Sequence, residues 1–188
     1  MQSIEAIYRA LLTRFNGAAP LFQTENLKPI AHIDRFKGQY LNPELHTVWN
    51  VPAIFLKFNI TWENTANNKQ RGAGILEVHV ELDNYHESYL GSSDFEKALV
   101  DYKYLQIIHA LVQGFGGDTW GPMSRITSDE DENPSNTNVT IIRYMFNVDD
   151  DSTDKYIDWI TAKLDDMTTI RKPVPEAPAL ADEDEYHI

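Results

Sequence analysis

The sequence contains no cysteine among its 188 residues, which excludes disulfides, thiolate metal sites and cysteine nucleophiles. Positive charge is also scarce, since 16 Lys and Arg stand against 29 Asp and Glu and the formal net charge is -13. Because proteins grip nucleic acid mainly by neutralising phosphates with Lys and Arg, we expect no dedicated DNA-binding surface. No apolar run approaches the roughly 20 residues that span a bilayer, so we expect no membrane partner.

The length suits a single domain with a substantial core. Apolar residues make up 42% of the chain and charged residues 24%, which is ordinary for a globular protein. The composition changes after residue 169, where three prolines precede the acidic run Asp182–Glu185. Proline interrupts regular structure and like charges repel one another. We therefore predict one α+β domain over residues 1–169 and an extended, Pro-rich acidic tail over residues 170–188.

The clearest pattern is a long β-hairpin over residues 51–83. Apolar and polar side chains alternate along both arms, and a period of two places successive side chains on opposite faces of a strand. The apolar face comprises Ile54, Leu56, Phe58, Ile60, Trp62, Leu76, Val78, Val80 and Leu82, and the polar face Lys57, Asn59, Thr61, Glu63, Glu77, His79, Glu81 and Asp83. One face is expected to be core and the other to meet water or a partner. The polar stretch Asn64–Gly72 is predicted to be a projecting loop, too long for a tight turn.

Hydrophobic spacing predicts the remaining elements. Helices are expected over residues 3–15, 93–113 and 153–165, a short strand over 29–36, and a second hairpin from residues 123–127 and 139–148 with an acidic loop at 128–136. In the helix over 93–113, the expected buried stripe is Leu99, Tyr102, Leu105, Ile108, Leu111 and Val112. This order predicts an α+β fold, in which an antiparallel sheet with two long hairpins is packed by helices on one face.

Patterns that would indicate catalysis are weak. The acidic cluster Asp149–Asp151 with Asp154 lacks the ligand spacing of a calcium loop, and it is typical of a solvated linker that caps a helix. His79 and His86 have no third ligand for a metal. The glycine-rich stretch Gly114–Gly121 follows a helix, whereas a phosphate cradle opens one. We therefore expect no catalytic residue, metal or cofactor, and predict that the protein is not an enzyme.

Several of these segments together resemble a known family. They are Val51-Pro-Ala-Ile-Phe-Leu-Lys-Phe58, Trp62, Gln70-Arg-Gly72 leading into Ile75-Leu-Glu-Val-His-Val80, and Leu105-Gln-Ile-Ile-His-Ala-Leu111. Over residues 1–148 the chain resembles bacteriophage tail-terminator (tail-completion) proteins, in a Bacteroidetes-phage-like variant. The resemblance implies a structural virion protein that assembles in the host cytoplasm. It also implies a homohexameric ring at the head-proximal end of the tail tube, which contacts tail-tube and head-connector proteins while DNA passes through without specific binding.

Two segments are predicted to contact other subunits or neck proteins. In the hairpin loop, the expected contact residues are Asn67, Asn68, Lys69, Gln70 and Arg71, because two cations there could meet acidic surfaces of a neighbouring copy. In the tail, they are Pro175, Pro178 and Tyr186, because a proline-rich strap is already extended and loses little entropy on docking.

Other interpretations of these segments stay open. The loop could be merely exposed, and the tail could be a solvated acidic brush. The protein could instead be a head-closure or tail-tube protein, or a small carboxylate-dependent hydrolase.

Overall fold

A computed structural model of the chain describes residues 2–66, 69–83, 86–131 and 138–151. Contacts divide the chain into two units, Met1–Thr153 and Asp154–Ile188. The expected helix over 153–165, the expected domain boundary after residue 169 and the expected tail all lie outside the described residues. No helix in the described part of the chain is long and apolar enough to cross a membrane.

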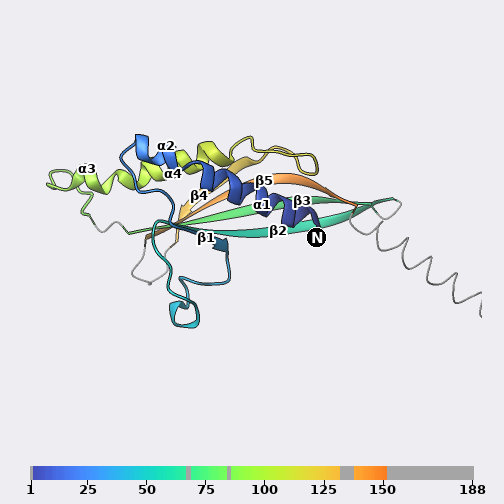
Figure 1. Ribbon diagram of the computed structural model, residues 1–188, viewed down its shortest axis with the longest axis horizontal. Helices are drawn as coiled ribbons and strands as arrows, with labels where there is room; N and C mark the ends of the chain where they lie inside the picture. The colour runs from blue at the N-terminus through green and yellow to red at the C-terminus, as the bar shows by residue number, and fades with distance from the viewer. Residues whose placement is uncertain (1, 67–68, 84–85, 132–137, 152–188) are drawn as a thin grey trace, which may run out of the picture. The chain divides into compact units, whose positions relative to one another are not determined.

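The fold is built on a five-stranded sheet with the strand order β1-β2-β3-β5-β4 (Figure 1). Its strands are β1 (His32–Arg35), β2 (Ala53–Ala66), β3 (Lys69–Leu82), β4 (Ser124–Glu130) and β5 (Asn138–Asp150). Both predicted hairpins are present, and the α+β class is confirmed. One feature differs from the expected antiparallel sheet, because β1 pairs with β2 in parallel. The chain between them crosses over before it re-enters the sheet, which is the connection that parallel neighbours require.

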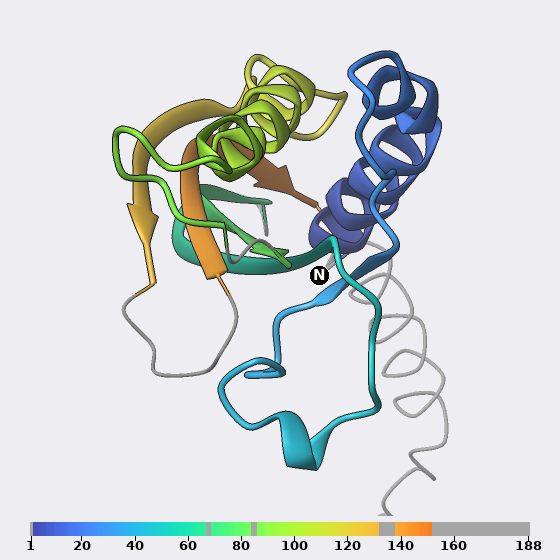
Figure 2. The same cartoon turned by 90° about the vertical axis from the view of Figure 1, so that its left-hand side faces the viewer.

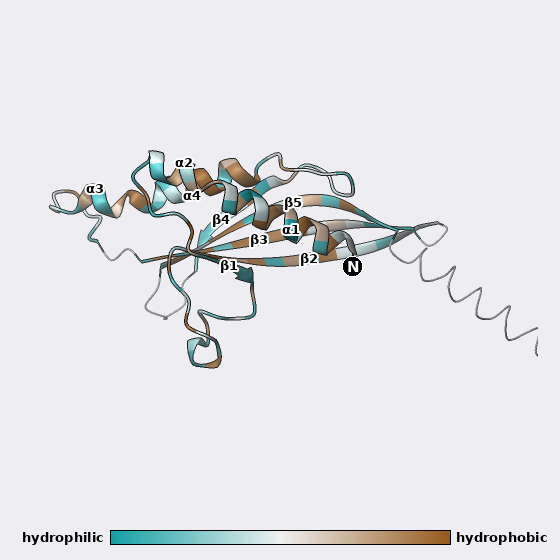
Figure 3. Cartoon of the chain, viewed as in Figure 1, coloured by the Kyte–Doolittle hydropathy of each residue, from teal (hydrophilic) through white to brown (hydrophobic). Residues whose placement is uncertain are grey.

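Helices cover one face of this sheet. They are α1 (Gln2–Gly17), α2 (Ala19–Thr24), α3 (Phe95–Ala98) and α4 (Val100–Val112), and both α1 and α4 lie across the same face (Figures 1 and 2). The main core forms between these helices and the strands, where the apolar colour concentrates in Figure 3. Its helical members include Ile7, Leu11, Phe15, Phe22, Tyr104, Ile107, Ile108 and Val112, and its strand members include Ile54, Leu56, Leu76, Val78, Val80, Ile142, Tyr144, Phe146 and Val148.

The predicted helix over 93–113 is wrong in two respects. The helix is interrupted at Leu99, and Tyr102 of the predicted buried stripe is 58% exposed, whereas Tyr104 is only 6% exposed. Tyr104, Ile108 and Val112 follow one another at intervals of four residues, which places them on one side of the helix. Tyr102 is displaced from that side by two residues, and its side chain therefore points away from the sheet.

The predicted loop Asn64–Gly72 is also wrong, because most of it is strand. β2 continues to Ala66 and β3 begins at Lys69. The ladder pairs Glu63 with Arg71, and β5 runs alongside, so that Gln70 faces Asp150. A third strand completes the hydrogen bonding of β3 and allows a polar hairpin to extend much further than composition alone indicates. The acidic loop expected at 128–136 likewise starts late, since β4 continues to Glu130.

Candidate functional site

The face of the sheet opposite the helices is the first candidate for a functional surface. The sequence indicated that this polar face meets water or a partner, but part of it is buried: His79 is 3% exposed and Glu81 is 2% exposed. The segment 36–51 folds back over the strands there and forms a second core. That core contains Tyr40, Ala53, Phe55 and Val139, with Phe36, Trp49, Val51 and Ile141 packed against it. The expectation of a wet face is therefore wrong at this end of the sheet.

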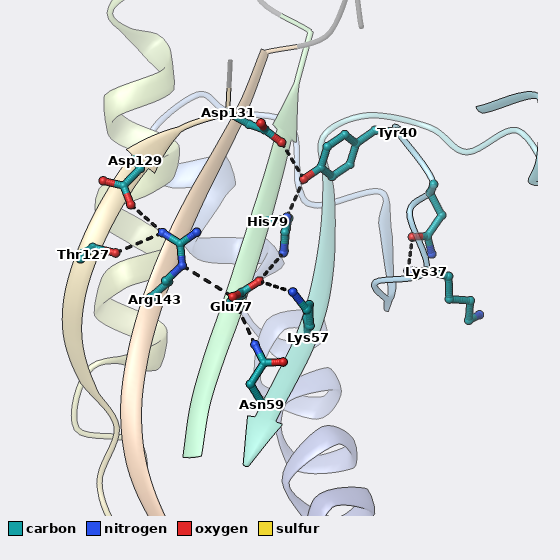
Figure 4. Close-up of polar contacts among 11 residues, drawn as sticks. Lys37, Tyr40, Lys57, Asn59, Glu77, His79, Thr127, Asp129, Asp131 and Arg143 are labelled. Carbon is teal, nitrogen blue, oxygen red and sulfur yellow. Dashed lines mark hydrogen bonds and ion pairs between the residues drawn. The ribbon is translucent and has the colours of Figure 1, made fainter. Parts of the chain in front are cut away.

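A charged network occupies the sheet beside this second core (Figure 4). Its centre is Glu77 on β3, flanked by Lys57 on β2 and Arg143 on β5 as direct cross-strand neighbours. Lys57 Nζ lies 3.0 Å from Glu77 Oε2, and Arg143 Nε lies 3.6 Å from Oε1. Asn59 also donates a hydrogen bond to Oε1, at 3.2 Å. Burial raises the pKa of Glu77, but the hydrogen bond and charge of Lys57, helped by Arg143, outweigh it and hold the pKa below its usual value.

A second set of contacts joins this network to the covering segment. The Tyr40 hydroxyl donates to Asp131 Oδ2 at 3.0 Å, and its oxygen lies 2.6 Å from His79 Nδ1. Because the one hydroxyl proton is used on Asp131, Nδ1 must carry the proton of the second contact. Nε2 of a neutral ring is then bare, and it lies 3.3 Å from Glu77 Oε2. The two atoms form an ion pair only when the ring is protonated. In the neutral ring Nε2 has no hydrogen-bond partner.

The pKa of His79 makes stability depend on pH. Burial lowers this pKa below its usual value, and the carboxylate of Glu77 only partly opposes the effect. An unfolded imidazole titrates near pH 6.5, so at lower pH the unfolded chain binds more protons than the native protein does. The contribution of His79 is therefore fully present above about pH 6.5 and is lost as the pH falls from there towards the lower native pKa.

We expect this loss to be visible in urea denaturation between pH 8 and pH 5. The free energy of unfolding should fall more steeply with decreasing pH in the natural protein than in His79→Gln, which has no imidazole to titrate at that position. Ordinary carboxylates titrate near pH 4 and contribute mainly below this range. His86→Gln is the control, because His86 is exposed and its removal should preserve the steep slope. Equal slopes in the natural protein and His79→Gln would contradict the assignment.

Polar contacts fix both ends of the covering segment. At one end, Tyr40 bonds to His79, and the buried Gln39 side chain donates to the Arg35 carbonyl at 2.7 Å. At the other end, Trp49 Nε1 donates to Glu81 Oε2 at 2.6 Å. Residues 41–48 lie between these anchors and form a loop that projects from the sheet (Figure 2). We refer to residues 41–48 as the anchored loop.

The network joins parts of the fold that are distant in sequence, and two of its central side chains are shielded from solvent. Tyr40 is 2% exposed and His79 is 3% exposed, so a substrate has no access to the imidazole. Sequence reasoning missed this network because two of its members, Tyr40 and Asp131, lie in segments without periodicity. The available signal was the presence of the aromatic residues Tyr40 and Trp49 in a stretch, residues 38–50, where hydrophobic spacing predicts no helix or strand.

The described contact residues of the hairpin lie together at the start of β3. Lys69 and Arg71 are exposed, and Gln70 is half-buried. They border a hollow of about 470 Å³ whose other lining residues are Thr65, Asp118, Thr119, Asp149, Asp150 and Asp151. The other expected contact residues, Asn67, Asn68, Pro175, Pro178 and Tyr186, lie outside the described residues.

Two members of the acidic cluster have structural partners. Arg71 Nε lies 2.9 Å from Asp149 Oδ1. Asp150 is 8% exposed, and its Oδ1 accepts a hydrogen bond from Ser3 Oγ at 3.3 Å. Within residues 2–66, 69–83, 86–131 and 138–151, no group of three or more His, Asp or Glu side chains is arranged to hold a metal ion. These carboxylates tie the end of β5 to α1 and β3.

The chain matches no protein-family model, and a search of curated proteins gives no significant match.

Proposed function

We propose that the protein is a structural phage virion protein, a tail terminator that forms a ring at the head-proximal end of the tail tube and joins the tube to the head connector. The resemblance of residues 1–148 to tail-terminator proteins supports this function. Independent support comes from the edges of the sheet.

The observation that carries the proposal is that both edges of the sheet are incomplete. β1 pairs only with the part of β2 from Ala53 to Leu56, and the Phe36 amide adds one further bond to the Leu56 carbonyl. Beyond that point, no strand among the described residues covers the outer edge of β2 over residues 57–66. The outer edge of β4 has no neighbouring strand in the described part either. Such edges pair with strands of other chains unless they are protected, and a ring subunit uses them in this way.

Charge also suits the proposed role. A formal net charge of -13 disfavours a tight grip on phosphates, so DNA can slide through a ring of such subunits. Within this acidic chain, Lys69 and Arg71 place two cations at the end of the long hairpin. They are complementary to acidic surfaces on a neighbouring copy, which favours assembly between copies.

The ring and its contact are tested by reversing these two charges. We expect Lys69→Glu/Arg71→Glu to block assembly and leave the monomer folded, because the Arg71–Asp149 ion pair is exposed on both sides (64% and 67%) and such pairs contribute little to stability. Native mass spectrometry over a range of concentrations measures the oligomer. The matched control is Lys28→Glu/Lys103→Glu, which makes the same change in charge at two exposed positions elsewhere.

The outcomes distinguish the proposed contact through Lys69 and Arg71 from the proposed ring itself. Hexamers in the control and monomers in the double variant would support both. Unchanged hexamers in Lys69→Glu/Arg71→Glu would show that the contact is wrong. A natural protein that stays monomeric at every concentration, alone and with its tail-tube protein, would contradict the proposed function.

A further inference from the structure

The anchored loop presents apolar side chains to solvent. Val48 is 93% exposed, Leu45 is 74% exposed and Leu41 is 46% exposed. All three lie between the Tyr40 and Trp49 anchors, and Pro43–Leu45 forms one turn of 3-10 helix. Loops whose ends are held close together in this way are often functional. An apolar group that is fixed in water by buried anchors indicates a docking surface.

The same chain carries a groove of suitable size. It lies between α1 and β2, has a volume of about 390 Å³, and is lined by Ile4, Glu5, Tyr8, Arg35 and Phe58. It reaches Phe58 because β1 ends at Arg35 and leaves this part of β2 uncovered. The volume lies within the range of sites that bind apolar groups. The walls are apolar, and one carboxylate and one guanidinium border the groove.

The loop and the groove match in charge. The loop carries Glu44 beside Leu45, and the groove carries Arg35. The other charged residue of the groove, Glu5, is already paired with Arg9, whose Nη2 lies 2.8 Å from Glu5 Oε1. Glu44 can therefore face Arg35, which sets unlike charges beside an apolar centre, the usual organisation of a protein interface.

The two surfaces lie on different sides of the sheet. The groove is formed with α1, on the helix side, whereas the anchored loop continues from the segment that covers Phe55 and His79 on the opposite side. A contact that joins one patch of a first copy to a different patch of a second copy is head-to-tail. Such contacts generate a ring when the rotation from one copy to the next closes.

We propose that the anchored loop of one copy inserts Leu45 and Val48 into the groove between α1 and β2 of a second copy. This inference rests on the proposed ring, and it specifies the contact that closes the ring. The free outer edge of β2 next to Phe58 then lies beside the inserted loop, which covers it from solvent.

The absence of cysteine makes a direct test possible. The full-length variants Val48→Cys and Glu5→Cys are each prepared alone, mixed at a concentration that allows assembly, and treated with a short bismaleimide cross-linker. Val48 and Glu5 are both exposed, so the fold should tolerate either change. Because each copy carries a single thiol, a Val48–Glu5 link can form only between different copies. Leu90→Cys mixed with Glu5→Cys is the control, since Leu90 is also 93% exposed but lies outside the loop.

Mass spectrometry of the digested product identifies the link. We expect the mixture of Val48→Cys and Glu5→Cys to give a Val48–Glu5 cross-link in high yield, and the Leu90→Cys control to give little. Oligomers that assemble without this link would overturn the inference and leave the proposed function standing, because the ring would then close through another contact. A protein that neither assembles nor cross-links would contradict both.

A substitution inside the loop provides a second measurement. Leu45→Asp/Val48→Asp should raise the concentration needed for half-assembly by about tenfold or more, since buried apolar anchors dominate interface energies. Leu90→Asp should leave that concentration unchanged. Circular dichroism confirms that each variant is folded. An unchanged midpoint in a folded Leu45→Asp/Val48→Asp variant would overturn the inference.

Discussion

Replacing Phe55 by alanine is expected to lower the free energy of unfolding by about 3–5 kcal/mol, the range for truncation of a buried aromatic side chain. Phe55 is 0% exposed, although it lies on the sheet face that the alternation of β2 and β3 assigns to water. Its ring contacts Trp49 edge-on, with centroids 5.5 Å apart, and lies 6.3 Å from the ring of Tyr40. Truncation therefore leaves a cavity under the covering segment and removes the support of both anchors.

Urea denaturation measures the loss, and Met145→Ala provides the comparison. Met145 lies on the same face of the sheet but is 54% exposed, so its truncation should change the free energy of unfolding by about 0.5 kcal/mol or less. A similarly small loss for Phe55→Ala would show that residues 36–51 do not cover this face in solution.

Gly74→Val should be the second strongly destabilising change, with a loss of about 1–3 kcal/mol from overpacking. Gly74 lies on the helix side of β3 and pairs with Ile60 on one side and Phe146 on the other. A Cβ placed on Gly74 would lie 2.5 Å from Cζ of the Phe146 ring. Phe146 is 4% exposed and packs against Phe58 with centroids 6.5 Å apart. The ring therefore cannot move aside without disturbing the core.

The adjacent residue supplies a matched control for this variant. Ala73 is the preceding residue of β3, lies on the opposite face and is exposed, so Ala73→Val adds the same side chain without a clash. Because β-branched residues suit exposed strand positions, we expect Ala73→Val to be neutral within about 0.5 kcal/mol. In thermal and urea unfolding, the Gly74→Val variant should unfold at a clearly lower temperature and urea concentration than the Ala73→Val variant. Equal stability of Gly74→Val and Ala73→Val would contradict the close packing of Phe146 over β3.

Local patterns predicted the periodic parts of this fold. The helix over 3–15, the short strand over 29–36 and both hairpins were predicted from apolar spacing, because each buries one side against the core. The parallel pairing of β1 does not follow from such spacing. It depends on how the chain crosses over between Arg35 and Ala53, and no local pattern records the path of a crossover.

The second core could not be predicted from the sequence for a different reason. Alternation identifies the polar face of β3 correctly, but it cannot show that an irregular segment returns to cover His79 and Glu81. Buried polar groups require partners, and here the partners are distant in sequence: His79 bonds to Tyr40, and Glu81 bonds to Trp49. Whether such groups are buried depends on tertiary contacts. Alternation alone predicts that polar strand residues are exposed to solvent.

The anchors of residues 41–48 also have an entropic consequence. Fixing the backbone of a flexible residue costs about 1–2 kcal/mol in conformational entropy, and a loose loop meets that cost each time it binds. In this protein the hydrogen bonds of Tyr40 and Trp49 order the ends of the loop when the monomer folds. For the proposed contact between copies, the loop is thus preorganised. We expect that loosening either anchor would weaken this proposed contact without changing any atom in it.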